Sequence, residues 1–72
     1  MYEKSFAKGV KEIIANNGYK QKAIAEKAGI EPDVFSKIVN GKRRIFAEEV
    51  SGICAALGYS FESIIEIGKK SA

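Results

Sequence analysis

Four positive charges and no acidic residue lie between Lys37 and Arg44. Lys37 falls on a predicted helix from about Pro32 to Asn40, and the basic turn Lys42-Arg43-Arg44 follows that helix directly. Lys and Arg side chains bind phosphate oxygens, and they do so without reading a base sequence. A basic cluster at the end of a short helix therefore fits contact with the phosphates that flank a groove of a polyanion.

The predicted helix from Pro32 to Asn40 has two different faces. Phe35 and Ile38 are spaced i, i+3, and this spacing predicts that both point inward. The opposite face is predicted to be exposed and holds Pro32, Asp33, Ser36, Lys37 and Asn40. Because the buried face anchors this helix, its other face stays free to enter the major groove of DNA.

The preceding helix supplies the other half of a two-helix unit over residues 21–41. Gln21 to Ala28 is predicted as a helix of about two turns, which must be held by packing because such short helices are unstable alone. Ala25 is small where the second helix would cross closely. Gly29 gives the turn a permissive backbone, and Ile30 is the apolar residue that fills the gap after it. This spacing predicts a helix-turn-helix.

The charge of the chain is distributed unevenly. The net charge is +3, but residues 1–44 contain ten Lys and Arg against five Asp and Glu, whereas residues 45–72 contain two against four. This asymmetry indicates a polyanionic partner on one side of the fold. Ordinary solvated lysines would give the same composition, so charge alone leaves both interpretations open.

The composition argues against several other functions. The chain has no His and one Cys, Cys54, which argues against the usual zinc sites, His-based acid–base catalysis and any internal disulfide. Cys54 is therefore predicted to be a packing residue. Glu48 and Glu49 are adjacent on a helix and do not face each other, so we interpret them as solvated charges of a first turn. We expect no enzymatic activity, cofactor, metal or small-molecule ligand.

The 72 residues fit one domain, residues 1–72, and five predicted helices follow each other between glycines. The sequence shows neither a signal peptide nor an apolar run that could span a membrane, so we expect a cytoplasmic protein. Ser60 is predicted to cap the last helix. Gly9 and Gly52 lie inside helices, where they would allow close packing. The fold class is predicted to be all-α, with helices over about 3–17, 21–28, 32–40, 47–57 and 61–67.

The segment from Gln21 to Gly41 resembles the helix-turn-helix of the lambda and 434 repressor and Cro-like regulators, the Cro/C1-type or XRE family. The resemblance covers nearly the whole chain and implies a compact, five-helix, lambda-repressor-like DNA-binding domain. A downstream Ala-Leu-Gly-x-Ser turn at the family spacing makes it specific. The matching residues are Gln21, Ile24-Ala25, Ala28-Gly29-Ile30, Phe35-Ser36-Lys37-Ile38, Asn40-Gly41-Lys42 and Ala56-Leu57-Gly58-Tyr59-Ser60.

The resemblance also implies roles for the candidate residues in reading bases. Pro32, Asp33 and Lys37 match positions that face base edges, and Ser36 lies where it reaches a phosphate or a base. Lys37 is the best single candidate for a base contact. Pro32 can offer only apolar contact, for example to a thymine methyl group. Asp33 could accept a hydrogen bond from a cytosine amino group, but a charge that only stabilises the helix dipole is an equal alternative.

The remaining candidates match positions that meet the DNA backbone. Gln21 matches a residue that contacts phosphate and braces the recognition helix. Asn40 matches a position whose side chain or backbone meets phosphate. The turn Lys42-Arg43-Arg44 matches the basic loop beside the backbone, although a charged loop that serves solubility is the simpler alternative.

The chain departs from the family pattern at several positions. Lys20 and Glu31 stand where Ser or Thr commonly caps the two helices, and neither is a good cap. Val39 replaces a residue that is often Glu, so we expect an apolar side chain that is partly exposed or turned toward a partner.

The predicted function is a sequence-specific regulator that binds double-stranded DNA, a repressor of the Cro-like phage, controller or antitoxin type. The resemblance implies a homodimer on DNA, and the apolar residues after Tyr59 suggest an interface on the C-terminal helix. The alternative from another class is a helical protein–protein interaction module that keeps the fold without binding DNA. Pro32, Asp33 and Val39 are its best support.

Overall fold

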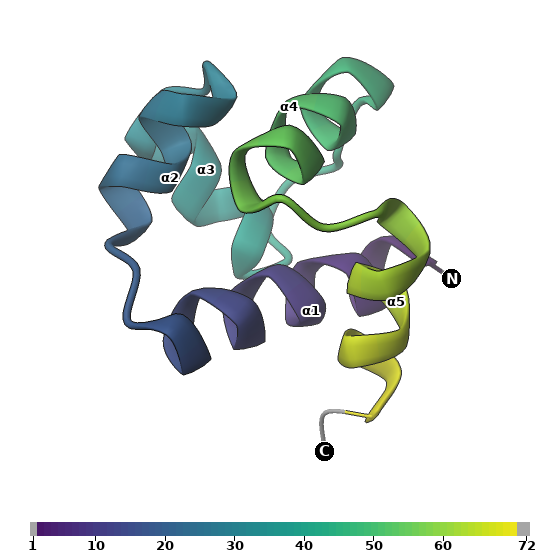
Figure 1. Ribbon diagram of the computed structural model, residues 1–72. Coiled ribbons are helices and arrows are strands. Elements are labelled where there is room, and N and C mark those ends of the chain that lie inside the picture. The colour runs from purple at the N-terminus through teal and green to yellow at the C-terminus, as the bar shows by residue number, and fades with distance from the viewer. Residues whose placement is uncertain (1, 71–72) are drawn as a thin grey trace.

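The computed structural model describes residues 2–70, and it consists of five helices joined by short turns (Figure 1). The described residues contain no β-strand, which confirms the all-α prediction. The helices are α1 (Tyr2–Asn17), α2 (Gln21–Ala28), α3 (Pro32–Val39), α4 (Ala47–Leu57) and α5 (Phe61–Lys70).

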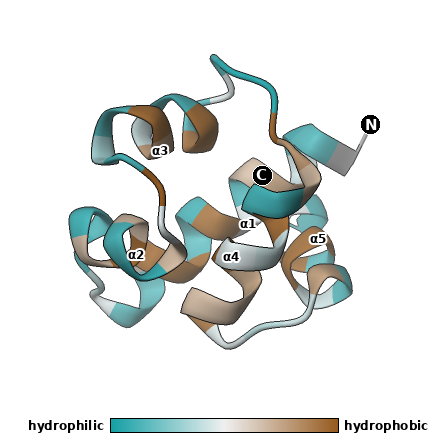
Figure 2. Ribbon diagram, turned by 90° about the horizontal axis from the view of Figure 1, so that it is seen from above, coloured by the Kyte–Doolittle hydropathy of each residue, from teal (hydrophilic) through white to brown (hydrophobic). Residues whose placement is uncertain are grey.

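One core joins all five helices. The side chains that are fully buried and largest come from α1, α3, α4 and α5, and they are Phe6, Val10, Ile13, Phe35, Ile38, Ile53 and Ile64. Figure 2 shows these helices turning their hydrophobic segments toward the centre while hydrophilic segments lie at the periphery. The rings of Phe6 and Phe61 stack with centroids 5.5 Å apart. The core residues recur at helical spacing, as their sequence pattern predicts.

Helices α1 and α5 form the most extensive packing between any two elements. Their backbones approach so closely that a Cβ atom added to Gly9 would overlap the carbonyl oxygen of Ile64. A Cβ atom added to Gly68 would overlap the carbonyl oxygen of Ser5. The prediction that Gly9 allows close packing is therefore confirmed. The sequence pattern predicts that the last helix ends at about Ile67, but the helix continues to Lys70 because Gly68 lies within this contact.

The turn between α2 and α3 has the geometry that a helix-turn-helix needs. Gly29 ends α2 with a φ of 74°, and the N–H of Ile30 donates to the carbonyl of Ala25 at 2.9 Å. Ala25 is fully buried and Ile30 is buried, as predicted. Helix α4 supports this unit from behind, because Gly52 allows α4 to approach α2. A Cβ atom at Gly52 would lie 2.7 Å from the carbonyl oxygen of Ala28.

The side-chain caps at the helix ends agree with the predictions made from the sequence. The hydroxyl of Ser60 accepts a hydrogen bond of 3.1 Å from the N–H of Ser63, which confirms Ser60 as a cap. Lys20 and Glu31 make no side-chain cap, as predicted.

No single helix within residues 2–70 is long and apolar enough to cross a membrane. The pair α4 and α5 passes that test by length and composition together, but it is bent by 84° at its break.

Candidate nucleic-acid interface

Helix α3 has one buried face and one exposed face. Phe35 and Ile38 are fully buried against the core. On the opposite side, Pro32, Asp33 and Lys37 are exposed and Ser36 is half-buried. Since α3 has only eight residues, its burial fixes the direction of this exposed face. The three residues that the sequence places at base edges thus lie together on one free surface.

Val39 differs from its prediction. It is only 4% exposed and belongs to the core, whereas its sequence suggested a partly exposed or partner-facing side chain. The physical reason is that α1 packs against the end of α3, so that Ala7 and Val39 lie along the same groove. Val39 therefore gives no support to a docking surface for another protein.

Gln21 is the first residue of α2, and its side chain is exposed. Because Lys20 does not cap this helix, no side chain occupies the N–H groups of its first turn at the cap position. Free N–H groups and the positive end of the helix dipole both favour an anion at such a place.

Asn40 follows α3 and links it to α1. Its side-chain amide donates to the carbonyl oxygen of Ser36 at 2.8 Å, and its Oδ1 accepts from Nζ of Lys11 at 3.0 Å. The amide side chain is thus held by protein groups on both sides. This arrangement brings Lys11, which is not among the candidates predicted from the sequence, to the C-terminal end of α3.

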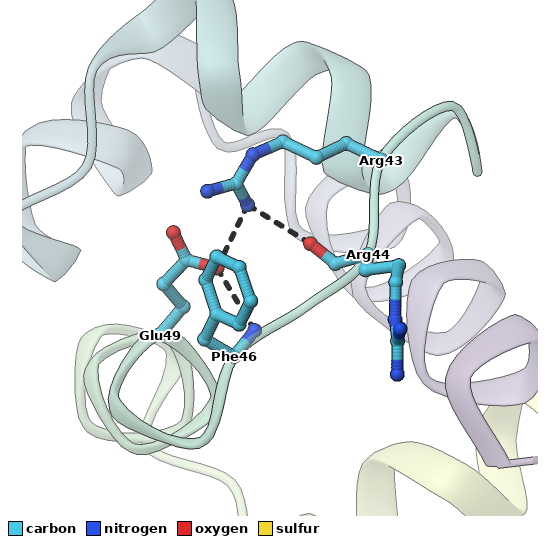
Figure 3. Close-up of polar contacts among 4 residues, drawn as sticks. All are labelled: Arg43, Arg44, Phe46 and Glu49. Carbon is cyan, nitrogen blue, oxygen red and sulfur yellow. Dashed lines mark hydrogen bonds and ion pairs between the residues drawn. The ribbon is translucent and has the colours of Figure 1, made fainter.

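Arg43 is held within the turn between α3 and α4 (Figure 3). Its guanidinium donates to the carboxylate of Glu49 at 2.9 Å and to the carbonyl oxygen of Arg44 at 2.9 Å, and it lies 5.0 Å from the centre of the Phe46 ring. The same Glu49 oxygen accepts the N–H of Phe46 at 3.0 Å, which caps the start of α4. The Glu49 carboxylate is thus hydrogen-bonded to Arg43 and to the backbone of Phe46, and its interpretation as a solvated charge is wrong.

The ion pair between Arg43 and Glu49 has two electrostatic consequences. The hydrogen bond from Arg43, opposed in part by burial, lowers the pKa of the Glu49 carboxyl below its ordinary value of 4.5. Both side chains are mostly shielded, at 30% exposed for Arg43 and 18% for Glu49. The Arg43 charge is therefore largely compensated by its neighbour.

Lys42 and Arg44 remain exposed on either side of Arg43. Figure 3 shows the side chain of Arg44 extending away from the cluster of Arg43 and Glu49, on the side of α1. The turn thus presents two uncompensated cations and one that braces the loop.

A model of the Cro/C1-type helix-turn-helix DNA-binding domain matches residues 10–70. The chain belongs to this family of DNA-binding domains. Two crystal structures of the clp gene regulator ClgR from Corynebacterium glutamicum are similar to it, each with a TM-score of 0.86 and 20% sequence identity. Each match covers 99% of this chain, and 92% or 76% of the ClgR chain. No curated protein sequence matches this chain.

The matched residues include α2, α3 and the turn between them, and the match confirms the family that the sequence resembles. The ClgR structures confirm the five-helix fold. Cys54 is half-buried against the core, as predicted for a packing residue, and burial raises the pKa of its thiol.

Three further lysines of this Cro/C1-type domain lie beside the basic turn. Lys4, Lys8 and Lys11 are exposed on α1 and line a groove together with residues of the turn. Their spacing of four and three residues places them on one face of a helix, and this signal is visible in the sequence. The three lysines contribute to the positive charge of the first 44 residues, but none of them is among the candidates predicted from the sequence.

Proposed function

We propose that this chain is a sequence-specific transcription regulator that reads the major groove with α3. The observation that carries the proposal is the position of Lys37 on the exposed face of a helix whose other face is fully buried. A rigidly held helix can present a few side chains to base edges in a fixed register. Pro32 and Asp33 share this surface and would set the preference for neighbouring bases.

Phosphate contacts on both sides of α3 would fix this register. We assign them to Gln21 at the start of α2 and to Asn40, Lys42 and Arg44 beyond the end of α3. Ser36 is half-buried next to Asn40 and would reach a phosphate through its hydroxyl. Arg43 would contribute mainly by holding the turn, because Glu49 compensates its charge.

The regulator would act as a homodimer in the cytoplasm, on a two-fold operator, with half-sites one DNA turn apart. Its type would be that of the Cro-like repressors, controllers or antitoxins, which the resemblance of its sequence implies. Helix α5 offers little apolar surface for such a dimer, since Ile64 and Ile65 are buried and Ile67 is half-buried. Among the described residues, the large hydrophobic side chains that are exposed are Phe46, at 59%, and Tyr19, at 43%. Phe46 is therefore a second candidate for the interface.

Selection of bound sequences from a random pool of double-stranded DNA tests this proposal. The expected result is one enriched motif with two-fold symmetry. Its affinity should fall steeply with salt, because several phosphate contacts release counterions. An interaction module without DNA binding would enrich no motif and show no salt-dependent binding to mixed DNA, and that result would overturn the proposal.

A further inference from the structure

A basic groove runs between the N-terminal half of α1 and the turn after α3. Its volume is about 610 Å³. Its floor includes the buried residues Ile38 and Val39, and its walls come from α1 and from residues 40–45. In Figure 2 the hydrophilic segment after α3 runs toward the N-terminal turns of α1. We call this feature the basic groove.

The residues that line the basic groove are strongly unbalanced in charge. One acidic residue, Glu3, lines it against six basic residues, which are Lys4, Lys8, Lys11, Lys42, Arg43 and Arg44. Of these six, Arg43 is paired with Glu49. A surface of this kind attracts an anion, and its attraction to a chain of phosphates adds along its length.

The chemistry of the basic groove favours a polyanion over a small molecule. Pockets for small ligands are mostly enclosed by apolar and aromatic side chains. This groove is instead walled by flexible cations, and the side chains of Lys4 and Lys8 are exposed to solvent. From Lys4 to Lys11 the helix rises by roughly 10 Å, which matches about three phosphate spacings of one DNA strand along the duplex axis.

The basic groove is also continuous with the interface already described. Lys11 donates to Asn40, so the lysines of α1 and the end of the recognition helix form one surface. An ammonium group has three donors, and Lys11 retains capacity for a phosphate beyond this bond. We propose that Lys4, Lys8 and Lys11 bind a second stretch of the DNA backbone, which extends the contact surface from the helix-turn-helix onto α1. This inference rests on the proposed function.

The test compares the salt dependence of DNA binding for two double variants of equal charge. Lys4→Gln with Lys8→Gln removes two charges from the basic groove and leaves the Lys11–Asn40 bond in place. Lys27→Gln with Lys69→Gln removes two exposed charges from α2 and α5 that do not line the groove. All four positions are exposed on helices, where Gln is well tolerated.

The variant with Lys4→Gln and Lys8→Gln should make the plot of log affinity against log salt concentration less steep by about 1.8, because each of the two lost phosphate contacts accounts for about 0.9. The ratio of specific to non-specific affinity should stay unchanged, because phosphate contacts do not read sequence. Ethylation of individual phosphates should reveal a cluster that blocks the wild type and no longer matters to the variant.

Three results would overturn the inference. Equal salt slopes for the two double variants would show that Lys4 and Lys8 do not bind DNA phosphates. The proposed function would still stand in that case, provided that the wild type binds DNA. NMR shifts of Lys4 and Lys8 with inorganic tripolyphosphate, but not with DNA, would make the groove a small-anion site. If the wild type bound no DNA at any salt concentration, both the inference and the proposed function would be wrong.

Discussion

The guanidinium of Arg43 donates a 2.9 Å hydrogen bond to the carboxylate of Glu49 and thereby ties the turn after α3 to the first turn of α4. Glu49 also accepts the backbone N–H of Phe46, so one carboxylate fixes both the loop and the helix start. The exposed cations Lys42 and Arg44 are carried by this braced segment. The position of the basic turn therefore depends on an acidic residue.

Replacing Glu49 by Gln should destabilise the domain by about 1 kcal/mol, because it removes a charge-assisted pair and weakens a cap of α4. Urea unfolding measures this change as a lower transition midpoint. Glu48→Gln is the matched control, since Glu48 is the adjacent exposed acid of the same turn and should change stability by less than about 0.5 kcal/mol. Equal losses in the two variants would assign the effect to net charge alone.

The ion pair between Arg43 and Glu49 should also make the free energy of unfolding depend on pH. Arg43 lowers the pKa of Glu49 in the folded state below the ordinary 4.5, so around that pH the unfolded chain binds more protons. The contribution of the pair is thus fully present above pH 4.5 and is lost as the pH falls through the lowered pKa. Urea unfolding of the wild type and Glu49→Gln at a series of pH values should show two stability curves that converge on acidification. Parallel curves would contradict the assignment.

The scaffold of the helix-turn-helix could be predicted from sequence because its signals are local. Ala25, Gly29 and Ile30 have types and spacing that suit a tight turn between packed helices, and the structure places them as predicted. The buried face of α3 follows from the spacing of Phe35 and Ile38 in the same way.

Other features could not be predicted because they depend on contacts between distant elements. Arg43 and Glu49 are six residues apart across an irregular turn, so no helical periodicity brings them together. Val39 is buried because α1 packs against the end of α3. The extension of α5 to Lys70 depends on the contact of Gly68 with Ser5, which no pattern within α5 indicates.

Replacing Gly9 by Ala tests the close contact of α1 with α5. Alanine in an exposed helix would stabilise by about 1 kcal/mol relative to glycine. Here the new methyl group would overlap the backbone of Ile64, so the expected effect is a loss of about 1–3 kcal/mol. Thermal unfolding measures the sign directly. A variant more stable than the wild type would show that the two helices are not in close contact at this position.

Replacing Lys37 by Ala should weaken binding to the selected operator by about 1–3 kcal/mol and relax the preference at one base position. The reason is that Lys37 is exposed on the face of α3 that we assign to base edges. Fluorescence anisotropy with the selected operator and with each base substitution provides the measurement. Lys27→Ala on α2 is the control and should leave the base preference unchanged. A uniform loss across all operators would instead make Lys37 a phosphate contact.

Replacing Arg44 by Gln and Arg43 by Gln should separate a phosphate contact from a structural residue. The Arg44 variant should bind all DNA sequences more weakly and lower the salt slope by about 0.9, since Arg44 is exposed and lines the basic groove. The Arg43 variant should change the slope less, because Glu49 already compensates its charge, and should lower the unfolding midpoint instead. Anisotropy at several salt concentrations and urea unfolding of both variants give the two readouts. If Arg43→Gln lowered the slope by about 0.9 without a loss of stability, Arg43 would leave Glu49 to bind DNA, and the turn would be held by other contacts.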